Sequence, residues 1–299
     1  KVSSVLLQHQ IEADALCRDI LAGKQIRRIY LSVTPGGGKS AVPIIVAARL
    51  IPRVVDAICW IAPRRSLQEQ AERNFLDPEF RRIIGHSHEI RASTNDVDPC
   101  RGTRGYCTTY QAIHADPQLH ASEFARKRYA LILDEPHHVE DEGPWSKSLR
   151  ALIDRARLVF FMTGTWERGD GQRIANYPYV RHPGGYALDL PPTSDEVLDL
   201  AFIRYTRGMA LEERAIKPLR FHPQDGRVEW IDTQGKTRVA DSLAATSGDY
   251  ASEALYTALN TEYAYQILDR TVQEWLGYRA HRPWAKLLIV AKGIAEAKS

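Results

Sequence analysis

The chain has 299 residues, which suits about two domains and is long enough to bury a substantial hydrophobic core. Hydrophobic residues make up 44% and charged residues 26% of the chain, the balance of an ordinary globular protein. The formal net charge of +3 neither requires nor excludes nucleic acid as a partner, so any basic surface has to be local. Since no apolar run approaches the ~20 residues of a membrane span and no signal-peptide pattern opens the chain, we expect a cytoplasmic protein without a membrane partner.

Residues 1–165 alternate short apolar runs with helical patterns. The apolar runs predict strands at residues 28–33, 57–62, 88–92, 106–108, 129–133 and 158–162. The helical patterns predict helices at residues 4–22, 40–50, 66–74, 122–127 and 146–155. Because strands that are apolar on both faces alternate with helices, we expect an α/β fold with a mostly parallel sheet and helices on both faces. Ligands of such sheets bind at the carboxyl ends of the strands.

The segment at residues 29–40, IYLSVTPGGGKS, joins the first predicted strand to the helix that follows it. Consecutive glycines let backbone N–H groups turn toward an anion, and the helix N-terminus adds further donors. A glycine-rich turn can also be only a tight loop, and Val33 stands where the usual phosphate-binding pattern has glycine. The Lys-Ser pair favours a nucleotide site, with Lys39 at the β- and γ-phosphates and Ser40 on Mg²⁺. The residues expected to bind the nucleotide are Thr34, Pro35, Gly36, Gly37, Gly38, Lys39 and Ser40.

Two adjacent acids, Asp134 and Glu135, follow the predicted strand at residues 129–133. Asp134 is expected to hold Mg²⁺ through its water shell, because Mg²⁺ binds few carboxylates directly and keeps its waters. Glu135 is expected to orient and deprotonate the water that attacks the γ-phosphate. The alternative is that the pair caps the next helix, but the glycine loop upstream favours an ATP site with Mg²⁺.

Further short motifs follow other predicted strands. The sequence reads LLQHQIEA near its start, APRRSL at residues 62–67, TTYQ at 108–111, DEPH at 134–137 and TGT at 163–165. Together with VTPGGGKS, and in this order, they resemble the motifs of the DEAD/DEAH-box branch of superfamily 2 helicases and translocases of bacterial or phage type. The resemblance implies a RecA-like P-loop NTPase lobe that binds ATP and Mg²⁺ and acts on nucleic acid.

The resemblance also implies individual roles. It places Gln10 at the adenine edge, where its amide offers a donor and an acceptor, with a surface glutamine on an N-terminal helix as the alternative. His137 is expected to bridge to the Thr-Gly-Thr segment rather than bind a metal. That segment would couple the ATP state to the grip on nucleic acid, through Thr163, Gly164 and Thr165. The expected catalytic residues are Lys39, Asp134 and Glu135.

Two motifs are candidates for contact with the phosphate backbone of DNA or RNA. Arg64 and Arg65 stand where a strand ends and a helix begins, a place that suits phosphate binding, although a solvated basic pair is the alternative. The hydroxyls of Thr108, Thr109 and Tyr110 could also reach phosphates, whereas β-branched residues there could simply build the strand. Backbone contacts of this kind imply a grip that is largely independent of base sequence.

The four cysteines form no C-x-x-C pair. Cys59 lies in an apolar strand pattern and is expected in the core. His86, His88, Cys100 and Cys107 could in principle gather a zinc ion, but their spacing fits no common zinc pattern. We therefore expect separate, reduced and mostly buried thiols.

The texture changes at residues 169–192, where Gly, Pro and Asp mark a connector. A helix at 195–209, a hairpin near 223–237 and helices within 252–279 are predicted after it, then a strand at 286–291 and a helix start at 293–298. We expect residues 1–189 to form the first RecA-like lobe, and 190–299 the connector, an inserted hairpin and helices, and the start of an incomplete second lobe. Motifs V and VI of the resembled family are not found, so the isolated chain is expected to be inactive or weak.

The sequence thus predicts an ATP-dependent helicase or translocase, a nucleic-acid-stimulated ATPase that couples hydrolysis to backbone grip. Two alternatives stay open. One is a P-loop ATPase that remodels protein complexes without unwinding, and the other is a non-catalytic nucleic-acid-binding or scaffold module.

Overall fold

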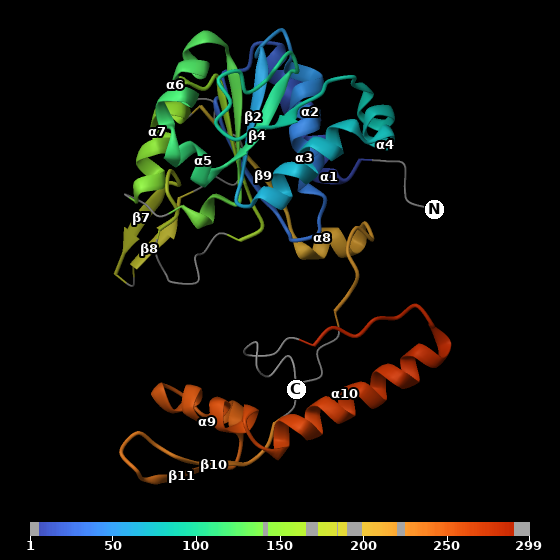
Figure 1. Cartoon of the computed structure of the whole chain (residues 1–299), viewed down its shortest axis with the longest axis vertical. Helices are drawn as coiled ribbons and strands as arrows, with labels where there is room; N and C mark the ends of the chain where they lie inside the picture. The colour runs from blue at the N-terminus through green and yellow to red at the C-terminus, as the bar shows by residue number, and fades with distance from the viewer. Residues whose placement is uncertain are drawn as a thin grey trace. The chain divides into compact units, whose positions relative to one another are not determined.

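A computed structural model describes residues 6–139, 143–165, 173–183, 185–189, 199–219 and 225–289. The chain divides into two compact units, Lys1–Pro218 and Leu219–Ser299, which are described separately below (Figure 1). Among the described residues, every helix is too short or too polar to pass through a lipid bilayer.

Unit 1 is built around a seven-stranded sheet with the order β3-β4-β2-β5-β6-β1-β9. All neighbouring strands in it are parallel. Three central strands, β2, β5 and β6, are buried along their whole length, which is why the sequence shows them as continuous apolar runs. The strands are β1 (Arg28–Val33), β2 (Ala57–Ala62), β3 (Arg91–Ala92), β4 (Gly105–Thr109), β5 (Tyr129–Asp134), β6 (Leu158–Thr163) and β9 (Leu200–Tyr205).

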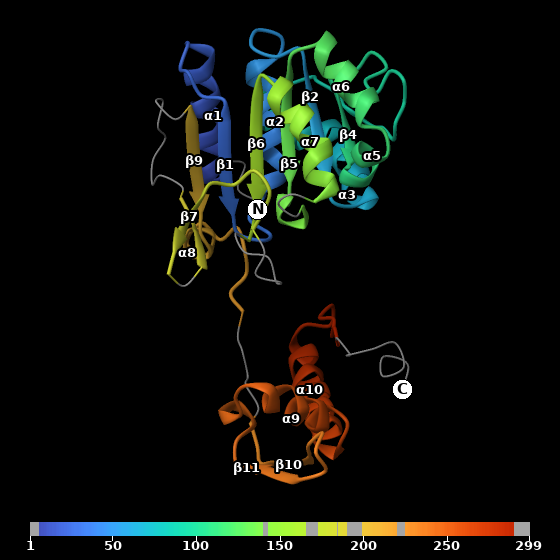
Figure 2. The same cartoon turned by 90° about the vertical axis from the view of Figure 1, so that its left-hand side faces the viewer.

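Helices cover both faces of this sheet (Figure 2). The buried residues of α1, α2 and α3 share one apolar cluster, and those of α5, α6 and α7 share the other. The α/β, RecA-like fold expected from the sequence is therefore confirmed. The helices are α1 (Gln8–Leu21), α2 (Val42–Leu50), α3 (Arg65–Leu76), α4 (Pro78–Phe80), α5 (Tyr110–Ala115), α6 (Pro117–Arg126), α7 (Pro144–Arg155) and α8 (Arg207–Glu212). Short helical turns lie at η1 (Lys39–Ala41), η2 (Arg81–Gly85) and η3 (Pro136–His138).

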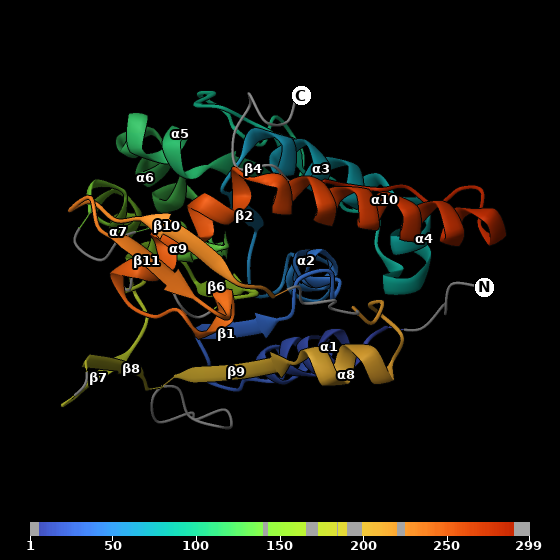
Figure 3. The same ribbon diagram turned by 90° about the horizontal axis from the view of Figure 1, so that it is seen from below.

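The prediction of a helix at 195–209 was wrong over residues 200–205 and correct over residues 207–209, where α8 begins. β9 is a strand that pairs in parallel with β1, in register from Arg28 with Leu200 to Val33 with Tyr205, and α8 begins only afterwards (Figure 3). Unit 1 extends to Pro218 and takes its edge strand β9 from the segment expected to hold the connector and the insertion, whereas the assignment of lobes stays a prediction.

The connector region contains an antiparallel hairpin of β7 (Tyr179–His182) and β8 (Gly185–Leu188). In unit 2 the predicted hairpin and helices are confirmed as β10 (Val228–Ile231), β11 (Thr237–Ala240), η4 (Leu243–Ala245), α9 (Asp249–Leu259) and α10 (Glu262–His281). Its core is small and centres on Trp230 and Ala254. The strand predicted at 286–291 is absent over residues 286–289, where Leu288 is exposed, and the remainder and the helix at 293–298 lie outside the described residues. That unit 2 begins a second lobe stays a prediction.

Candidate active site

The predicted motifs gather at one edge of the sheet because parallel strands all end on the same side. β1 runs into the glycine loop, β5 into Glu135 and β6 into Gly164. In the strand order β5-β6-β1 these three ends are neighbours in the centre of the sheet. Segments far apart in the sequence therefore meet at one place.

The glycine loop has a backbone that side chains would disturb. Gly36 and Gly38 have φ of +77° and +82°, in the left-handed region that glycine favours. A Cβ on Gly37 would lie 2.8 Å from the Thr34 carbonyl oxygen, and one on Gly38 would lie 3.1 Å from Gln10 Nε2. The loop thus needs its glycines to keep this shape, which fits a cradle where backbone approaches a phosphate closely.

Lys39 lies between the two acids predicted to be its partners. Its Nζ is 3.0 Å from Asp134 Oδ1 and also pairs with Glu135 Oε1. Asp134 Oδ1 is buried and, apart from this ion pair with Lys39, has no polar partner among the described residues. An oxygen with a spare lone pair beside Ser40 in the same cavity fits a Mg²⁺-binding role. The expected meeting of the glycine loop and the Asp-Glu pair is confirmed.

Glu135 is held in a fixed position by the Thr-Gly-Thr segment. Its backbone has a φ of +51°, which is unusual for a residue other than glycine, and its N–H donates to the Met162 carbonyl at 2.8 Å. Its Oε2 accepts hydrogen bonds from Thr163 Oγ1 at 3.0 Å and from the Gly164 N–H at 3.3 Å. The carboxylate thus joins the lysine of the cradle to the end of β6.

His137 completes this group. Its Nδ1 lies 3.2 Å from Thr163 Oγ1, 3.3 Å from Thr165 Oγ1 and 3.2 Å from Glu135 Oε2. The predicted bridge from His137 to the Thr-Gly-Thr segment is therefore present. Its contribution to coupling stays a prediction, because a contact alone does not demonstrate energetic coupling.

Two cavities meet at Glu135. One of about 420 Å³ is lined by the glycine loop, Lys39, Ser40 and both acids, the residues expected to bind a nucleotide. The other, of about 370 Å³, is lined by Pro35, Arg64, Glu135, His137, Gly164 and Thr165. One carboxylate thus faces both the expected ATP site and a cavity that carries an arginine of the expected nucleic-acid contact.

Gln10 contacts the glycine loop directly. Its Nε2 donates to the Gly38 carbonyl at 3.0 Å, and its Oε1 accepts from the Leu7 N–H at 3.0 Å. Each end of the amide keeps one further bonding position, so adenine reading stays a prediction. The structure adds a second role, because Gln10 ties helix α1 to the loop that would hold the phosphates.

The two arginines of the APRRSL motif are placed differently. Arg64 is exposed and lines the second cavity together with Glu135. Arg65 begins α3, and its side chain is 85% exposed and lies 3.6 Å from Glu69. Arg64 is therefore better placed than Arg65 to contact a nucleic-acid phosphate in the cavity that Glu135 also lines.

The prediction of phosphate contacts through Thr108 and Tyr110 needs correction. Thr108 is fully buried in β4, and Tyr110 is 1% exposed, so no phosphate can reach either side chain. The Tyr110 hydroxyl instead donates to the Asp134 backbone carbonyl at 3.0 Å and thereby supports the acidic motif. Thr109 is partly exposed, and its hydroxyl accepts a hydrogen bond from the Ala112 N–H as the N-cap of α5.

This correction gives a testable expectation for Tyr110→Phe. Loss of the hydrogen bond to the Asp134 carbonyl should lower the free energy of unfolding by about 1 kcal/mol. Affinity for nucleic acid should not change. Urea unfolding followed by circular dichroism, with oligonucleotide binding measured on the same samples, checks both. Weaker binding at unchanged stability would return Tyr110 to the nucleic-acid interface.

A group beside the glycine loop was not anticipated. His9 is fully buried, and its ring lies 4.4 Å from the Tyr205 ring, centroid to centroid. The Tyr205 hydroxyl donates to Glu213 Oε2 at 2.7 Å, and the same oxygen accepts from the Gln8 N–H at 3.3 Å. Burial lowers the pKa of His9 to about 4, so this ring is neutral near pH 7. The signal was missed because Tyr205 lies in β9, which the sequence pattern presents as a helix.

The cysteines and histidines outside this site form no metal centre within the described residues. All four cysteines are buried and free, as expected. Burial raises the pKa of Cys17 to about 12, which keeps this thiol protonated and unreactive. The zinc alternative at His86, His88, Cys100 and Cys107 therefore has no support in this structure.

The parallel sheet and the motifs at its carboxyl edge define unit 1 as a superfamily 2 helicase-like domain. A family model described as type III restriction enzyme, res subunit, matches residues 3–168. This match covers more than half of the chain, and the chain belongs to this family.

Relatives and solved structures are more distant. The chain is 26% identical over 290 residues to an uncharacterized protein of Mycobacterium tuberculosis, named MT2985 in strain CDC 1551 / Oshkosh, and matches Rv2917 of strain H37Rv equally. These alignments cover 93% of the chain and 44% of each relative, so the chain spans less than half the length of the curated relatives it matches.

Two helicase structures illustrate the structural likeness. The UvsW helicase from bacteriophage T4 is similar at 21% identity and a TM-score of 0.40, over 55% of this chain and 54% of that one. The Pyrococcus furiosus Hef helicase domain is similar at 14% identity and a TM-score of 0.43, over 73% of this chain and 43% of that one. Likenesses at this level are too distant to bear on activity or substrate.

Proposed function

We propose that this chain is the ATP-binding part of a helicase or translocase that couples ATP hydrolysis to its grip on the backbone of DNA or RNA. The observation that carries the proposal is the contact of Lys39 with both Asp134 and Glu135 at the carboxyl edge of the sheet. A cation beside a glycine loop, with two carboxylates opposite, suits the binding of a nucleotide with its metal and the transfer of a phosphoryl group to water.

The residues of the site would have separate roles. The glycine loop and Lys39 would bind the β- and γ-phosphates, and Ser40 and Asp134 would hold Mg²⁺. When bound, Mg²⁺ neutralises phosphate charge. Glu135 would orient the attacking water and accept its proton, because it is the carboxylate that Thr163 and Gly164 fix beside Lys39.

The same contacts support a route for coupling. Glu135 pairs with Lys39 and receives hydrogen bonds from the Thr-Gly-Thr segment. A γ-phosphate would compete with Glu135 for Lys39. A resulting shift of the carboxylate would change its contacts with Thr163 and His137, and His137 lines the cavity that Arg64 also lines.

The experiment that tests this function measures ATP hydrolysis by the full-length protein with and without RNA, single-stranded DNA and duplex DNA. Stimulation by at least one nucleic acid is expected. Hydrolysis that no nucleic acid alters would favour an ATPase that remodels protein complexes. Absence of hydrolysis together with intact nucleic-acid binding would favour a non-catalytic scaffold.

A variant with both Arg64→Ala and Arg65→Ala is expected to bind single strands more weakly and with less dependence on salt. Each phosphate contact that is lost should reduce the slope of log affinity against log salt by about 0.7. The single change Arg64→Ala should account for more of the effect than Arg65→Ala, because Arg65 already lies beside Glu69.

Fluorescence anisotropy of a labelled single strand over a range of salt concentrations measures this slope. Arg73→Ala, an exposed arginine in the last turn of the same helix, is the matched control. A slope that neither Arg64 nor Arg65 alters would place the nucleic-acid contact on another surface.

A further inference from the structure

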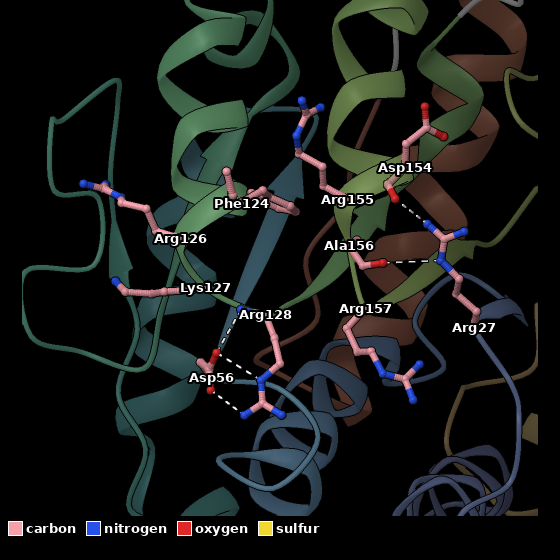
Figure 4. A pocket seen from close by; sticks show the side chains of 11 residues that line it. Arg27, Asp56, Phe124, Arg126, Lys127, Arg128, Asp154, Arg155, Ala156 and Arg157 are labelled. Carbon is pink, nitrogen blue, oxygen red and sulfur yellow. Dashed lines mark hydrogen bonds and ion pairs between the residues drawn. The ribbon is translucent and has the colours of Figure 1, made fainter.

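A basic pocket of about 410 Å³ lies at the edge of the sheet opposite the candidate active site (Figure 4). The residues that immediately precede β1, β2, β5 and β6 all line it: Arg27, Asp56, Arg128 and Arg157. Since a six-residue strand is about 20 Å long, the pocket is about that far from the glycine loop. Six cations and two carboxylates line it, and none belongs to a motif described above.

Two of the arginines build the floor of this basic pocket. The Arg27 guanidinium donates to the carbonyls of Ile153, Asp154 and Ala156 at 2.8, 2.8 and 3.3 Å, and so binds the C-terminal end of α7. Arg128 pairs with Asp56 at 2.6 Å and also donates to the carbonyls of Pro52 and Arg53. These hydrogen bonds fix the two guanidinium groups in place, so the floor is rigid.

A buried acid holds a second pair of cations. Glu123 is 2% exposed and binds Lys127 at 2.9 Å and Arg126 at its other oxygen, while the Tyr129 hydroxyl donates to it at 2.7 Å. Burial alone would raise the pKa of Glu123, but these hydrogen bonds hold it below its usual range. One anion thus faces two cations, which leaves a net positive charge on this rim.

Two further arginines on the other rim have no acidic partner among the described residues. Arg155 and Arg157 are exposed, and Arg155 donates only to the Ala151 carbonyl one turn earlier, at 3.1 Å. The nearest acid along the chain is Asp154, whose carboxylate points away from the Arg157 guanidinium in Figure 4. The charge of these two guanidinium groups is therefore available to a ligand.

The lining favours phosphate over other ligands. Its large apolar side chain, Phe124, is 4% exposed, so neither a base nor an apolar side chain of a peptide has a surface to pack on. The carbonyls of Ile153, Asp154 and Ala156 are already occupied by Arg27. The accessible charge is mainly guanidinium and ammonium, since six cations face the carboxylates of Asp56 and Asp154, and such cations match phosphate oxygens and read no sequence.

We propose that this basic pocket binds phosphate groups and serves as a second contact for the nucleic-acid backbone, on the far side of the domain from the ATP site. Its assignment to nucleic acid rests on the function proposed above. The phosphate chemistry does not, because it follows from the cations alone. A bound strand here would add affinity and salt dependence without touching nucleotide hydrolysis directly.

The test compares the double variant Arg155→Ala/Arg157→Ala with a charge-matched control, Arg18→Ala/Arg82→Ala, which removes two exposed arginines elsewhere in unit 1. Binding of labelled single-stranded and duplex oligonucleotides is measured over a range of salt concentrations. The pocket variant is expected to lose about 1.4 from the salt slope for single strands, about 0.7 for each arginine, whereas the control should lose none.

A second arm identifies the source of the phosphate. Binding of inorganic triphosphate is measured by calorimetry in a Lys39→Ala background, so that the ATP site does not contribute. If the Arg155/Arg157 changes weaken only this binding, the pocket is a phosphate site for a small polyphosphate. If they weaken neither ligand, the proposal is overturned.

The Arg64/Arg65 variants distinguish this failure from failure of the proposed function. If those variants weaken oligonucleotide binding while the Arg155/Arg157 variant does not, the motor function stands and the second contact is wrong. If the wild-type chain binds triphosphate at the pocket but no oligonucleotide at all, the phosphate site stands and the proposed function fails.

Discussion

Lys39→Ala is expected to weaken binding of ATP strongly. Lys39 is the cation of the glycine loop, and its Nζ already lies 3.0 Å from Asp134, where a γ-phosphate and its metal would sit. A charge-assisted hydrogen bond to phosphate contributes about 1.5–3 kcal/mol, so the affinity should fall by roughly 10- to 150-fold. Anisotropy of a fluorescent ATP analogue measures the loss directly.

The same substitution leaves Asp134 and Glu135 side by side without their cation. Asp134 is 8% exposed in its side chain, so repulsion between the two carboxylates could lower stability and imitate a binding defect. The double variant Lys39→Ala/Glu135→Gln removes this repulsion and should melt near the wild-type temperature while its affinity for ATP stays reduced. Lys24→Ala, a surface lysine that pairs with Asp19, is the control for loss of a charge. Unchanged affinity in Lys39→Ala would refute the assignment of the glycine loop as a phosphate cradle.

The parts of the fold that the sequence predicted well are those whose environment is uniform. β1, β2, β5 and β6 lie between two helical layers, so nearly every position is apolar and the runs stand out from the flanking polar residues. β9 was not predicted as a strand, because its environment is not uniform. It has a mixed burial pattern, and its partner β1 is more than 160 residues earlier in the chain, a contact that local periodicity does not reveal.

For the candidate site too, the sequence predicted some residues correctly and others wrongly. The sequence predicted that Lys39, Asp134 and Glu135 meet, because a parallel sheet brings the ends of its strands to one edge, and the family resemblance supplied the bridge from His137. The sequence predicted wrongly that Tyr110 contacts phosphate. The burial of Tyr110 depends on how α5 packs, and the TTYQ motif alone does not reveal this packing. The Tyr205–Glu213 hydrogen bond was missed together with β9.

The basic pocket was also invisible to motif reading. Arg27, Asp56, Arg128 and Arg157 come from four separate segments, each one residue before a strand, and the chain as a whole is close to neutral. The parallel sheet concentrates them, because it brings the beginnings of strands together as well as their ends. A net charge of +3 for the whole chain therefore gives no sign of this local excess of cations. Which arginines lack an acidic partner can be seen only in the three-dimensional structure.

Glu135→Gln is expected to leave ATP binding intact and to stop turnover in the full-length protein. An amide cannot accept the proton of the attacking water, and loss of a general base costs about 10²- to 10⁴-fold in rate. The side-chain oxygen of glutamine can still accept from Thr163 and Gly164, so the contact with the Thr-Gly-Thr segment should survive. Affinity for ATP should not fall, since the change removes a carboxylate that competes with the γ-phosphate for Lys39.

The two halves of this expectation are measured separately, as the dissociation constant for an ATP analogue and as the rate of phosphate release with nucleic acid present. Glu79→Gln, an exposed acid in α4, controls for loss of a surface charge. If Glu135→Gln binds and turns over normally, another group must accept the proton, and Glu135 would be a positioning residue for Lys39. If it loses binding as well, the carboxylate is needed to hold the glycine loop and the lysine in place, and its competition with the γ-phosphate is refuted. Only retained binding with lost turnover assigns the proton transfer to Glu135. That outcome would show that the carboxylate, still held by Thr163, is needed for the chemical step and not for holding the nucleotide.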